Sequence, residues 1–198
     1  QHLADDLISQ MIAIEEEGDR LSETELAAMI SLLISAGHQT SFNLIATGTL
    51  MLLDHPDQLE KLKADLSLVP TAVEELLRFN GPLTLITPRF ATVDVEIAGQ
   101  QIKKGDMLIP MLKSVNRDET QFTQPEELDI ARTLNRHIAF GDGIHTCLGA
   151  PLARLEGDIA FTTLLKRMPD LRLSAPRESI VWRFSFSSPS LTALPITF

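Results

Sequence analysis

The chain has 198 residues, 44% of them hydrophobic and 22% charged, which is typical of one globular domain with a sizeable core. Its formal net charge at pH 7 is −10, which argues against nucleic acid and anionic membrane surfaces as general partners. The longest apolar run, residues 27–36, contains Ser31 and Ser35, so we predict no membrane span, and no signal peptide is visible.

Two helical patterns open the chain. Residues 2–17 carry apolar side chains at helical spacing. Ser22-Glu23-Thr24-Glu25 has the pattern of a capping box and begins a second, longer helix that runs to about Leu53, just before Pro56. Because apolar residues lie almost all round this second helix, we expect it to cross the core.

The middle of the long helix carries the stretch Ala36-Gly37-His38-Gln39-Thr40-Ser41. Glycine in a helix interior costs about 1 kcal/mol relative to alanine, and Ser and Thr compete locally for backbone hydrogen bonds. One interpretation is a tolerated kink whose polar residues face a neighbour. The other is a notch at Gly37 that admits a ligand against the backbone. The residues alone leave both open.

Two shorter helices follow, one from Pro56 to about Leu66 and one from Pro70 to Asn80. The second carries Glu75 and Arg78, three residues apart on one face. Pairs at this spacing are usually exposed and contribute roughly 0.3 kcal/mol, so the pair alone indicates little.

Residues 83–110 alternate and turn as short strands do, with Gly99 and Gly105 at turns. The expected strands are Leu83–Ile86, Thr92–Ile97, Gln101–Ile102 and Met107–Ile109. Arg89 lies among them, where an arginine is usually a solvated surface residue. Short strands are expected again after Leu171, at Ile180–Phe184 and Leu191–Phe198. These elements predict a fold class that is mainly α with small β-sheets (α+β).

The single cysteine, Cys147, lies in the glycine-punctuated stretch Phe140-Gly141-Asp142-Gly143-Ile144-His145-Thr146-Cys147-Leu148-Gly149. A lone cysteine excludes an internal disulfide and fits a reducing compartment, so we expect a cytoplasmic protein. After Gly149 the apolar residues recur at helical spacing, with Pro151 suited to a first turn. Cys147 is therefore expected where a loop enters a helix, and this position favours a thiolate.

Four interpretations of Cys147 follow from the residues. The first is a small buried hydrophobic residue, the commonest fate of a free cysteine. The second is a nucleophile with His145 as base, for which no orienting acid is apparent. The third is zinc binding with His137 and His145, whose spacing fits no closed structural site and lacks a fourth ligand. The fourth is axial ligation of haem iron, which needs one thiolate and close backbone approach.

The string Phe140-x-x-Gly143-x-x-x-Cys147-x-Gly149 resembles the haem-binding signature of the cytochrome P-450 family. Glu75-x-x-Arg78 resembles that family's Glu-x-x-Arg motif, and the stretch around Gly37 resembles its oxygen-binding groove. The resemblance covers the whole chain but only the carboxy-terminal half of a typical member. Since the chain also begins with Gln1 rather than Met, we expect residues 1–198 to be the carboxy-terminal, haem-binding part of a single cytochrome P-450 domain.

The resemblance implies that the cofactor is haem b, iron protoporphyrin IX, with Cys147 as the metal ligand. The residues implied to bind the cofactor are Cys147, Phe140, Gly141, Gly143, His145, Leu148, Gly149 and Arg89. Phe140 would pack beside the thiolate, while N–H groups near Leu148 and Gly149 would stabilise the sulfur charge. Arg89 and His145 would anchor the propionates. His137 is interpreted as a structural hydrogen-bond donor rather than a ligand.

The resemblance also implies catalytic roles for Gly37, Gln39 and Thr40. Gly37 and Thr40 would border the oxygen site, with Thr40 donating a hydrogen bond to dioxygen. Gln39 stands where most members carry Asp or Glu, and an amide cannot relay protons as a carboxylate does. The residues implied to line the substrate side are Leu85, Ile86 and Thr87. The residues implied to form a buried ion-pair network that holds the haem loop are Glu75, Arg78 and Arg132.

The resemblance implies a haem-thiolate monooxygenase that inserts one oxygen atom from O2 into a small apolar substrate. Its electrons would come from a ferredoxin or flavodoxin-type donor docking at the cysteine face. The residues expected to offer positive charge there are Lys113, Arg117, Arg136 and Arg154. Two alternatives stay open: a peroxide-dependent haem-thiolate enzyme, which the amide of Gln39 favours, and a truncated, catalytically inactive remnant.

Overall fold

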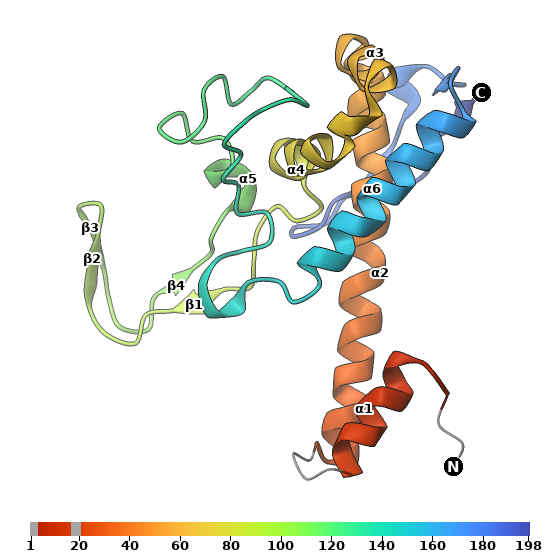
Figure 1. Cartoon of the computed structure of the whole chain (residues 1–198). Helices are drawn as coiled ribbons and strands as arrows, with labels where there is room; N and C mark the ends of the chain where they lie inside the picture. Colours follow the sequence, from red (N-terminus) through yellow and green to blue (C-terminus); the bar gives the residue numbers. More distant parts are fainter. Residues whose placement is uncertain (1–3, 17–20) are drawn as a thin grey trace. The chain divides into compact units, whose positions relative to one another are not determined.

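The computed structural model describes residues 4–16 and 21–198 (Figure 1). The chain divides into two compact units, Gln1–Gln39 and Thr40–Phe198. The first holds α1 (Leu7–Glu16) and the beginning of α2 (Glu23–Asp54). The predicted ends of the first helix, residues 2–3 and 17, lie outside the described residues. The capping box is confirmed, because the Ser22 N–H donates to Glu25 Oε2 at 2.8 Å and the Glu25 N–H donates to Ser22 Oγ at 3.3 Å.

The long helix α2 is continuous through the stretch around Gly37, but only its second part is buried. Residues 31–39 are exposed, and Leu32 and Ile34 expose 59% and 66% of their surface. From Asn43 to Leu52 the helix contributes buried side chains to the core. The prediction that this helix crosses the core is therefore right for its second part and wrong for its first. Apolar composition predicts burial but cannot say whether the same chain supplies the covering partner.

The core of residues 40–198 is built mainly from helices, joined by Leu128, Ile130, Ile180 and Leu191 from other segments. The long helices besides α2 are α3 (Pro56–Ala64), α4 (Val69–Asn80) and α6 (Ala150–Arg167). The short ones are α5 (Leu112–Val115) and the 3-10 turns η1 (Leu66–Leu68), η2 (Gly143–His145) and η3 (Arg177–Ser179). Two glycines let the long helices approach closely. A Cβ on Gly48 of α2 would lie 2.7 Å from Phe161 Cζ of α6, and a Cβ on Gly157 of α6 would lie 3.1 Å from Val73 Cγ1 of α4.

Within the described residues, the strands form four two-stranded antiparallel sheets. The pairs are β1 (Arg89–Phe90) with β4 (Met107–Leu108), β2 (Val95–Ile97) with β3 (Gln100–Ile102), β5 (Arg172–Leu173) with β8 (Ile196–Thr197), and β6 (Trp182–Arg183) with β7 (Ser190–Leu191). In register, Arg89 faces Leu108 and Val95 faces Ile102. Figure 1 shows β2 and β3 as a hairpin that extends away from the helices of residues 40–198, turning at Gly99 with φ +78°.

One predicted strand, Leu83–Ile86, does not form. The Thr84 N–H donates to Ser187 O at 2.7 Å, and the Ile86 N–H donates to Pro110 O at 3.2 Å. Because these bonds reach two different segments, no ladder can develop. The fold class is as predicted, mainly α with small strand pairs. None of the described helices is both long and apolar enough to cross a bilayer.

Candidate functional site

The glycine loop before α6 presents Cys147 to solvent. Gly141 and Gly143 both have φ +74°, a left-handed conformation that strongly favours glycine. The Cys147 N–H donates to Phe140 O at 2.9 Å and closes the loop. Helix α6 begins directly after it, at Ala150. Cys147 is a free and exposed thiol, so the interpretation as a small buried hydrophobic residue is wrong.

The nucleophile and zinc interpretations find no support in the contacts. Among the described residues, no hydrogen bond joins His145 to Cys147. His137 uses both ring nitrogens elsewhere: Nε2 bonds to Glu74 Oε2 at 3.0 Å and Nδ1 accepts the Ala139 N–H at 3.1 Å. Within residues 4–16 and 21–198 no group of three or more His, Cys, Asp or Glu could hold a metal ion. A zinc site is therefore wrong for this part of the chain, and the histidine is a structural donor as expected.

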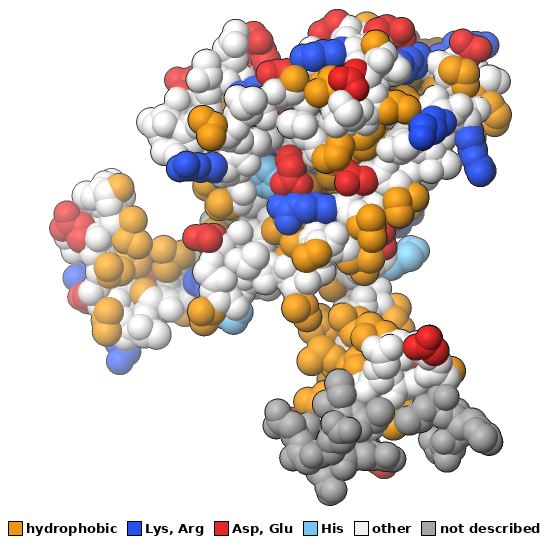
Figure 2. All heavy atoms as spheres, viewed as in Figure 1, with side chains coloured by type: hydrophobic (Ala, Val, Ile, Leu, Met, Phe, Trp, Pro, Cys, Tyr) orange, Lys and Arg blue, Asp and Glu red, His pale blue; other side chains and the backbone are white. Residues whose placement is uncertain are grey.

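The surroundings of Cys147 fit one face of a flat apolar macrocycle. Apolar side chains next to it point into solvent: Ile144 is 97% exposed, Leu148 85% and Leu152 58%. Figure 2 shows hydrophobic side chains along the surface of α6, and Leu155 and Ile159 continue that face. A Cβ on Gly143 would meet nothing within 4 Å, so the loop leaves room above it. One exposed thiol in an apolar, glycine-lined surface suits axial ligation of haem iron.

Glu75 and Arg78 on α4 are completely buried and paired. Arg78 Nε donates to Glu75 Oε2 and Arg78 Nη2 to Glu75 Oε1, both at 2.8 Å. Arg132 Nε lies 3.1 Å from Glu75 Oε2, and Asn135 Nδ2 donates to the same oxygen at 3.0 Å. The structure thus brings Glu75, Arg78 and Arg132 together. A bidentate, charge-assisted pair of this kind has strong geometric specificity.

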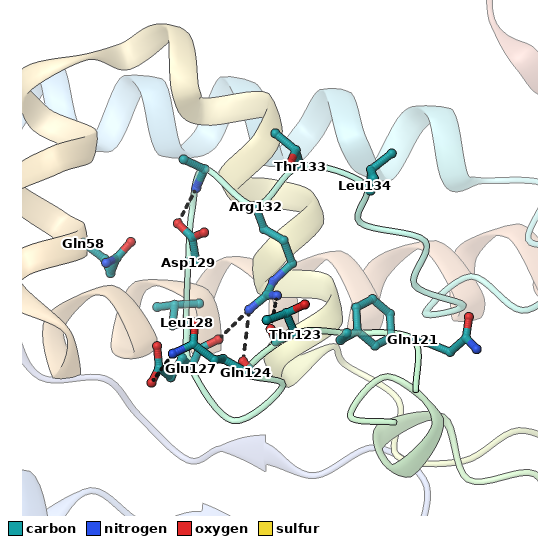
Figure 3. Close-up of a pocket in the computed structure, with 12 residues that line it drawn as sticks. Gln58, Gln121, Thr123, Gln124, Glu127, Leu128, Asp129, Arg132, Thr133 and Leu134 are labelled. Carbon is teal, nitrogen blue, oxygen red and sulfur yellow. Dashed lines mark hydrogen bonds between the residues drawn. The ribbon is translucent and has the colours of Figure 1, made fainter. Parts of the chain in front are cut away.

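The two arginines also bind the backbone of the loop before the cysteine. Arg78 Nη1 donates to the carbonyls of Asn116 and Pro125. Arg132 donates to the carbonyls of Thr123, Gln124 and Glu127 (Figure 3). Arg78 thereby has a partner within the chain for each of its guanidinium N–H groups, and its bonds fix residues 116–127 to α4.

A polar cavity of about 570 Å³ opens beside Arg132. Figure 3 shows the loop side chains around it, and none belongs to the cysteine loop. The lining residues are Gln58, Gln121, Phe122, Thr123, Gln124, Glu127, Leu128, Asp129, Ala131, Arg132, Thr133 and Leu134. This cavity is separate from the surface around Cys147.

A second ion-pair cluster lies directly beside the cysteine loop, and sequence reasoning missed it. Glu74 Oε1 accepts Arg154 Nε at 2.6 Å, and Glu74 Oε2 accepts Arg154 Nη2 at 2.9 Å as well as His137 Nε2. Burial opposes ionisation of Glu74, but the hydrogen bonds from His137 and Arg154 outweigh it and lower the pKa of the carboxyl to about 2. The only sequence signal was a second acid beside Glu75.

Of the predicted propionate and substrate residues, Arg89 lies on β1 and Leu85, Ile86 and Thr87 lie just before it. Arg89 is exposed and its Nη1 donates to Thr87 Oγ1 at 2.7 Å. His145 is exposed on the cysteine loop. Leu85 is only 6% exposed, which leaves little surface for a substrate, whereas Ile86 is half-buried and Thr87 exposed. Their roles stay predictions.

The predicted oxygen-site residues lie on either side of a unit boundary. Gly37 and Gln39 are exposed and belong to the first unit, and Thr40 is half-buried at the start of the second. A Cβ on Gly37 would meet nothing within 4 Å, and the helix passes through this position unbroken. Their proximity to the cysteine loop stays a prediction.

Three of the four expected docking cations have partners within the chain. Arg154 is neutralised by Glu74, and Arg117 Nε lies 3.0 Å from Glu126 Oε2. Lys113 Nζ donates to Asn80 Oδ1 at 2.8 Å, while burial and, secondarily, the charge of Arg117 lower the pKa of this lysine. Arg136 is exposed. The positive charge offered to a partner is therefore smaller than the sequence suggests.

Comparison with known proteins decides the family. The sequence model described as Cytochrome P450 matches residues 1–169. The chain belongs to the cytochrome P450 family. The polyketide biosynthesis cytochrome P450 PksS of Bacillus subtilis strain 168 is 49% identical over 193 residues, which is 98% of this chain and 48% of that protein.

Solved P450 structures share the fold described above. That of PksS superposes with a TM-score of 0.93, covering 98% of this chain and 50% of that chain at 49% identity. The ligand-free P450 monooxygenase TamI gives a TM-score of 0.92 at 44% identity, over 98% of this chain and 48% of that one. The chain thus spans about half the length of the curated relatives it matches.

Proposed function

We propose that residues 1–198 are the carboxy-terminal, haem-binding part of a longer P450, here called the whole protein, which is a haem-thiolate monooxygenase. The observation that carries the proposal is the free, exposed thiol of Cys147 on a closed glycine loop at the start of α6. Family membership supports haem iron as the group that this thiol binds.

In this proposal the cysteine loop holds haem b through several of its own groups. Cys147 ligates the iron as a thiolate, with the backbone N–H groups near Leu148 and Gly149 stabilising the sulfur charge. Phe140 packs beside the sulfur, while Gly141 and Gly143 keep side chains away from the ring. Arg89 and His145 bind the propionates. Bound haem supplies the oxygen-activating iron chemistry.

Gly37 and Thr40 of α2 would border the oxygen site, where Thr40 would donate a hydrogen bond. Ile86 and Thr87, with any exposed edge of Leu85, line the side where a small apolar substrate binds. Electrons come from a ferredoxin or flavodoxin-type donor, for which Arg136 is the docking cation with the most exposed charge. A cytoplasmic location agrees with a chain whose only cysteine is a free thiol.

The test uses the whole protein with an apolar compound whose addition changes the haem absorption spectrum. With reduced ferredoxin and isotopically labelled dioxygen, one labelled oxygen atom should appear in the product. Product without label, or no product with an intact haem spectrum, contradicts monooxygenation.

Gln39 favours a second candidate, a peroxide-dependent haem-thiolate enzyme, because an amide cannot relay the protons that dioxygen activation needs. Turnover with hydrogen peroxide but not with ferredoxin and dioxygen would support it. Under that candidate Gln39→Glu should raise the dioxygen-supported rate and leave the peroxide-supported rate unchanged.

A further inference from the structure

Two consecutive glutamates on α4 bind different segments of the chain. Glu75 binds Arg78, Arg132 and the loop of residues 116–135. Glu74 binds His137 and Arg154, which lie on either side of the cysteine loop in sequence. The Glu75 network therefore fixes residues 116–135, which precede the cysteine loop. Glu74 fixes the two segments that flank the cysteine loop.

The partners of Glu74 enclose Phe140. The Arg154 guanidinium lies 4.6 Å from the centroid of the Phe140 ring, and the His137 ring lies 6.2 Å away at a tilted angle. The Phe140 carbonyl in turn accepts the Cys147 N–H at 2.9 Å. A continuous set of contacts therefore runs from the Glu74 carboxylate through Phe140 to the cysteine.

We propose that Glu74 is a positioning residue for Cys147: it holds Phe140 through Arg154 and His137, and it offsets the charge of Arg154 beside the cysteine loop. This inference rests on the proposed function, in which Cys147 binds haem iron. The hydrogen bond from Glu74 raises the pKa of Arg154, and burial opposes this increase. The contact of Arg154 with the Phe140 ring, together with the hydrogen bond from the Cys147 N–H to the Phe140 carbonyl, places this charge next to the cysteine loop.

The two charges have opposite effects on the iron. A cation near the thiolate stabilises negative charge on sulfur, weakens its donation and raises the reduction potential of bound iron. A carboxylate that neutralises this cation lowers the potential again. Removing the charge of Arg154 and removing the charge of Glu74 are therefore expected to shift the reduction potential in opposite directions.

The test is a redox titration of the whole, haem-loaded protein. Glu74→Gln should raise the midpoint potential, because Arg154 is left uncompensated, and Arg154→Gln should lower it. A merely structural role would move both variants in the same direction. Shifts of the same sign, or no shift in either, overturn the inference.

The chain offers a matched control in Arg117, which also pairs with a glutamate, Glu126, and lies over a phenylalanine ring, that of Phe79, at 5.0 Å. Glu126→Gln should leave the potential unchanged. If Glu74→Gln fails to incorporate haem, the double variant Glu74→Gln with Arg154→Gln shows whether the uncompensated charge of Arg154 causes the loss. Recovered haem supports an uncompensated charge as the lesion, and continued loss contradicts it. An unmodified whole protein without a thiolate-type spectrum would instead defeat the proposed function.

Discussion

At the scale of single residues, Glu75 and Arg78 differ from an ordinary helix ion pair through burial. Both are fully excluded from solvent, and each retains hydrogen-bond partners for its charge. An exposed pair at the same spacing, Glu60 with Lys63 on α3, lies at the same 2.8 Å. Pairs with the same sequence spacing therefore contribute differently to stability, because only the buried pair leaves an uncompensated buried charge when one partner is removed.

We expect Glu75→Gln to destabilise the whole protein by roughly 3 to 5 kcal/mol, because Arg78 and Arg132 lose their buried counter-charge. Haem content should fall with it, since the loop of residues 116–135 loses its anchor. Glu60→Gln is the control and should change the free energy of unfolding by less than about 0.5 kcal/mol. Denaturant unfolding and haem quantification measure both effects, and full haem content in Glu75→Gln would count against an anchoring role.

Glu74 predicts a specific acid sensitivity. Its pKa is about 2 in the folded chain against an ordinary value of 4.5, so its stabilising contribution is present above pH 4.5 and is lost as the pH falls towards 2. The contribution is on the order of 2 kcal/mol once screening at the partly exposed Arg154 is allowed for. Asp158 acts in the opposite direction, because burial and then the charge of Glu74 raise its pKa.

Unfolding of the whole protein measured between pH 5 and pH 2.5 checks this expectation. Glu74→Gln should flatten the loss of stability in that range relative to the unmodified protein. An identical slope in both proteins would mean that other carboxyl groups are responsible.

Local motifs were sufficient to single out Cys147 and Glu75 in the sequence; the contacts of Glu75 are observed, whereas iron binding by Cys147 stays a prediction. Sequence alone was insufficient for Glu74, whose partners His137 and Arg154 lie 63 and 80 residues away. Arg154 was assigned to a docking surface for the same reason. The sequence shows which residues are charged, but whether a charge is neutralised by a partner depends on tertiary contacts.

At the scale of elements, the helices of the core depend on glycines that carry no conformational strain. Gly48 on α2 faces Phe161 of α6 and Leu76 of α4, and Gly157 on α6 faces Val73. A side chain at either position would separate helices that now touch. The contact between α4 and α6 also sets the distance from Glu74 to Arg154.

Gly48→Ala should destabilise the whole protein by about 1 to 3 kcal/mol, since the new Cβ would lie 2.7 Å from Phe161 Cζ. Phe161→Leu in the same background should recover part of that loss, because it removes the ring atom that clashes. Denaturant unfolding of the two single variants and the double variant gives the coupling energy. Strictly additive effects would show that Gly48 and Phe161 do not share this contact.

Helix existence was predictable from periodicity and caps, as α2 and its capping box show. The failed strand at Leu83–Ile86 has the alternation of a strand but finds single partners on two different segments. The exposed beginning of α2 shows a second limit of prediction from sequence. An apolar face predicts that a helix is buried, but it does not identify the segment that covers the helix.

At the scale of the whole molecule, apolar surface is exposed on several elements. The exposed residues include Leu32, Ile34, Leu152, Leu155, Phe184 and Phe186. The chain spans about half the length of the curated relatives it matches. We expect the remainder of the whole protein to cover some of these side chains, since large apolar side chains lower the free energy when they leave water.

The central claim, that Cys147 binds haem iron as a thiolate, is tested by the carbon monoxide difference spectrum of the reduced whole protein. The unmodified protein should show the strongly red-shifted band of a thiolate-ligated haem. Thr146→Ser, which preserves the hydroxyl bond to Gly143 O, should keep it, and Cys147→Ser should abolish it. A red-shifted band that persists in Cys147→Ser, or is absent from the unmodified protein, would contradict the assignment.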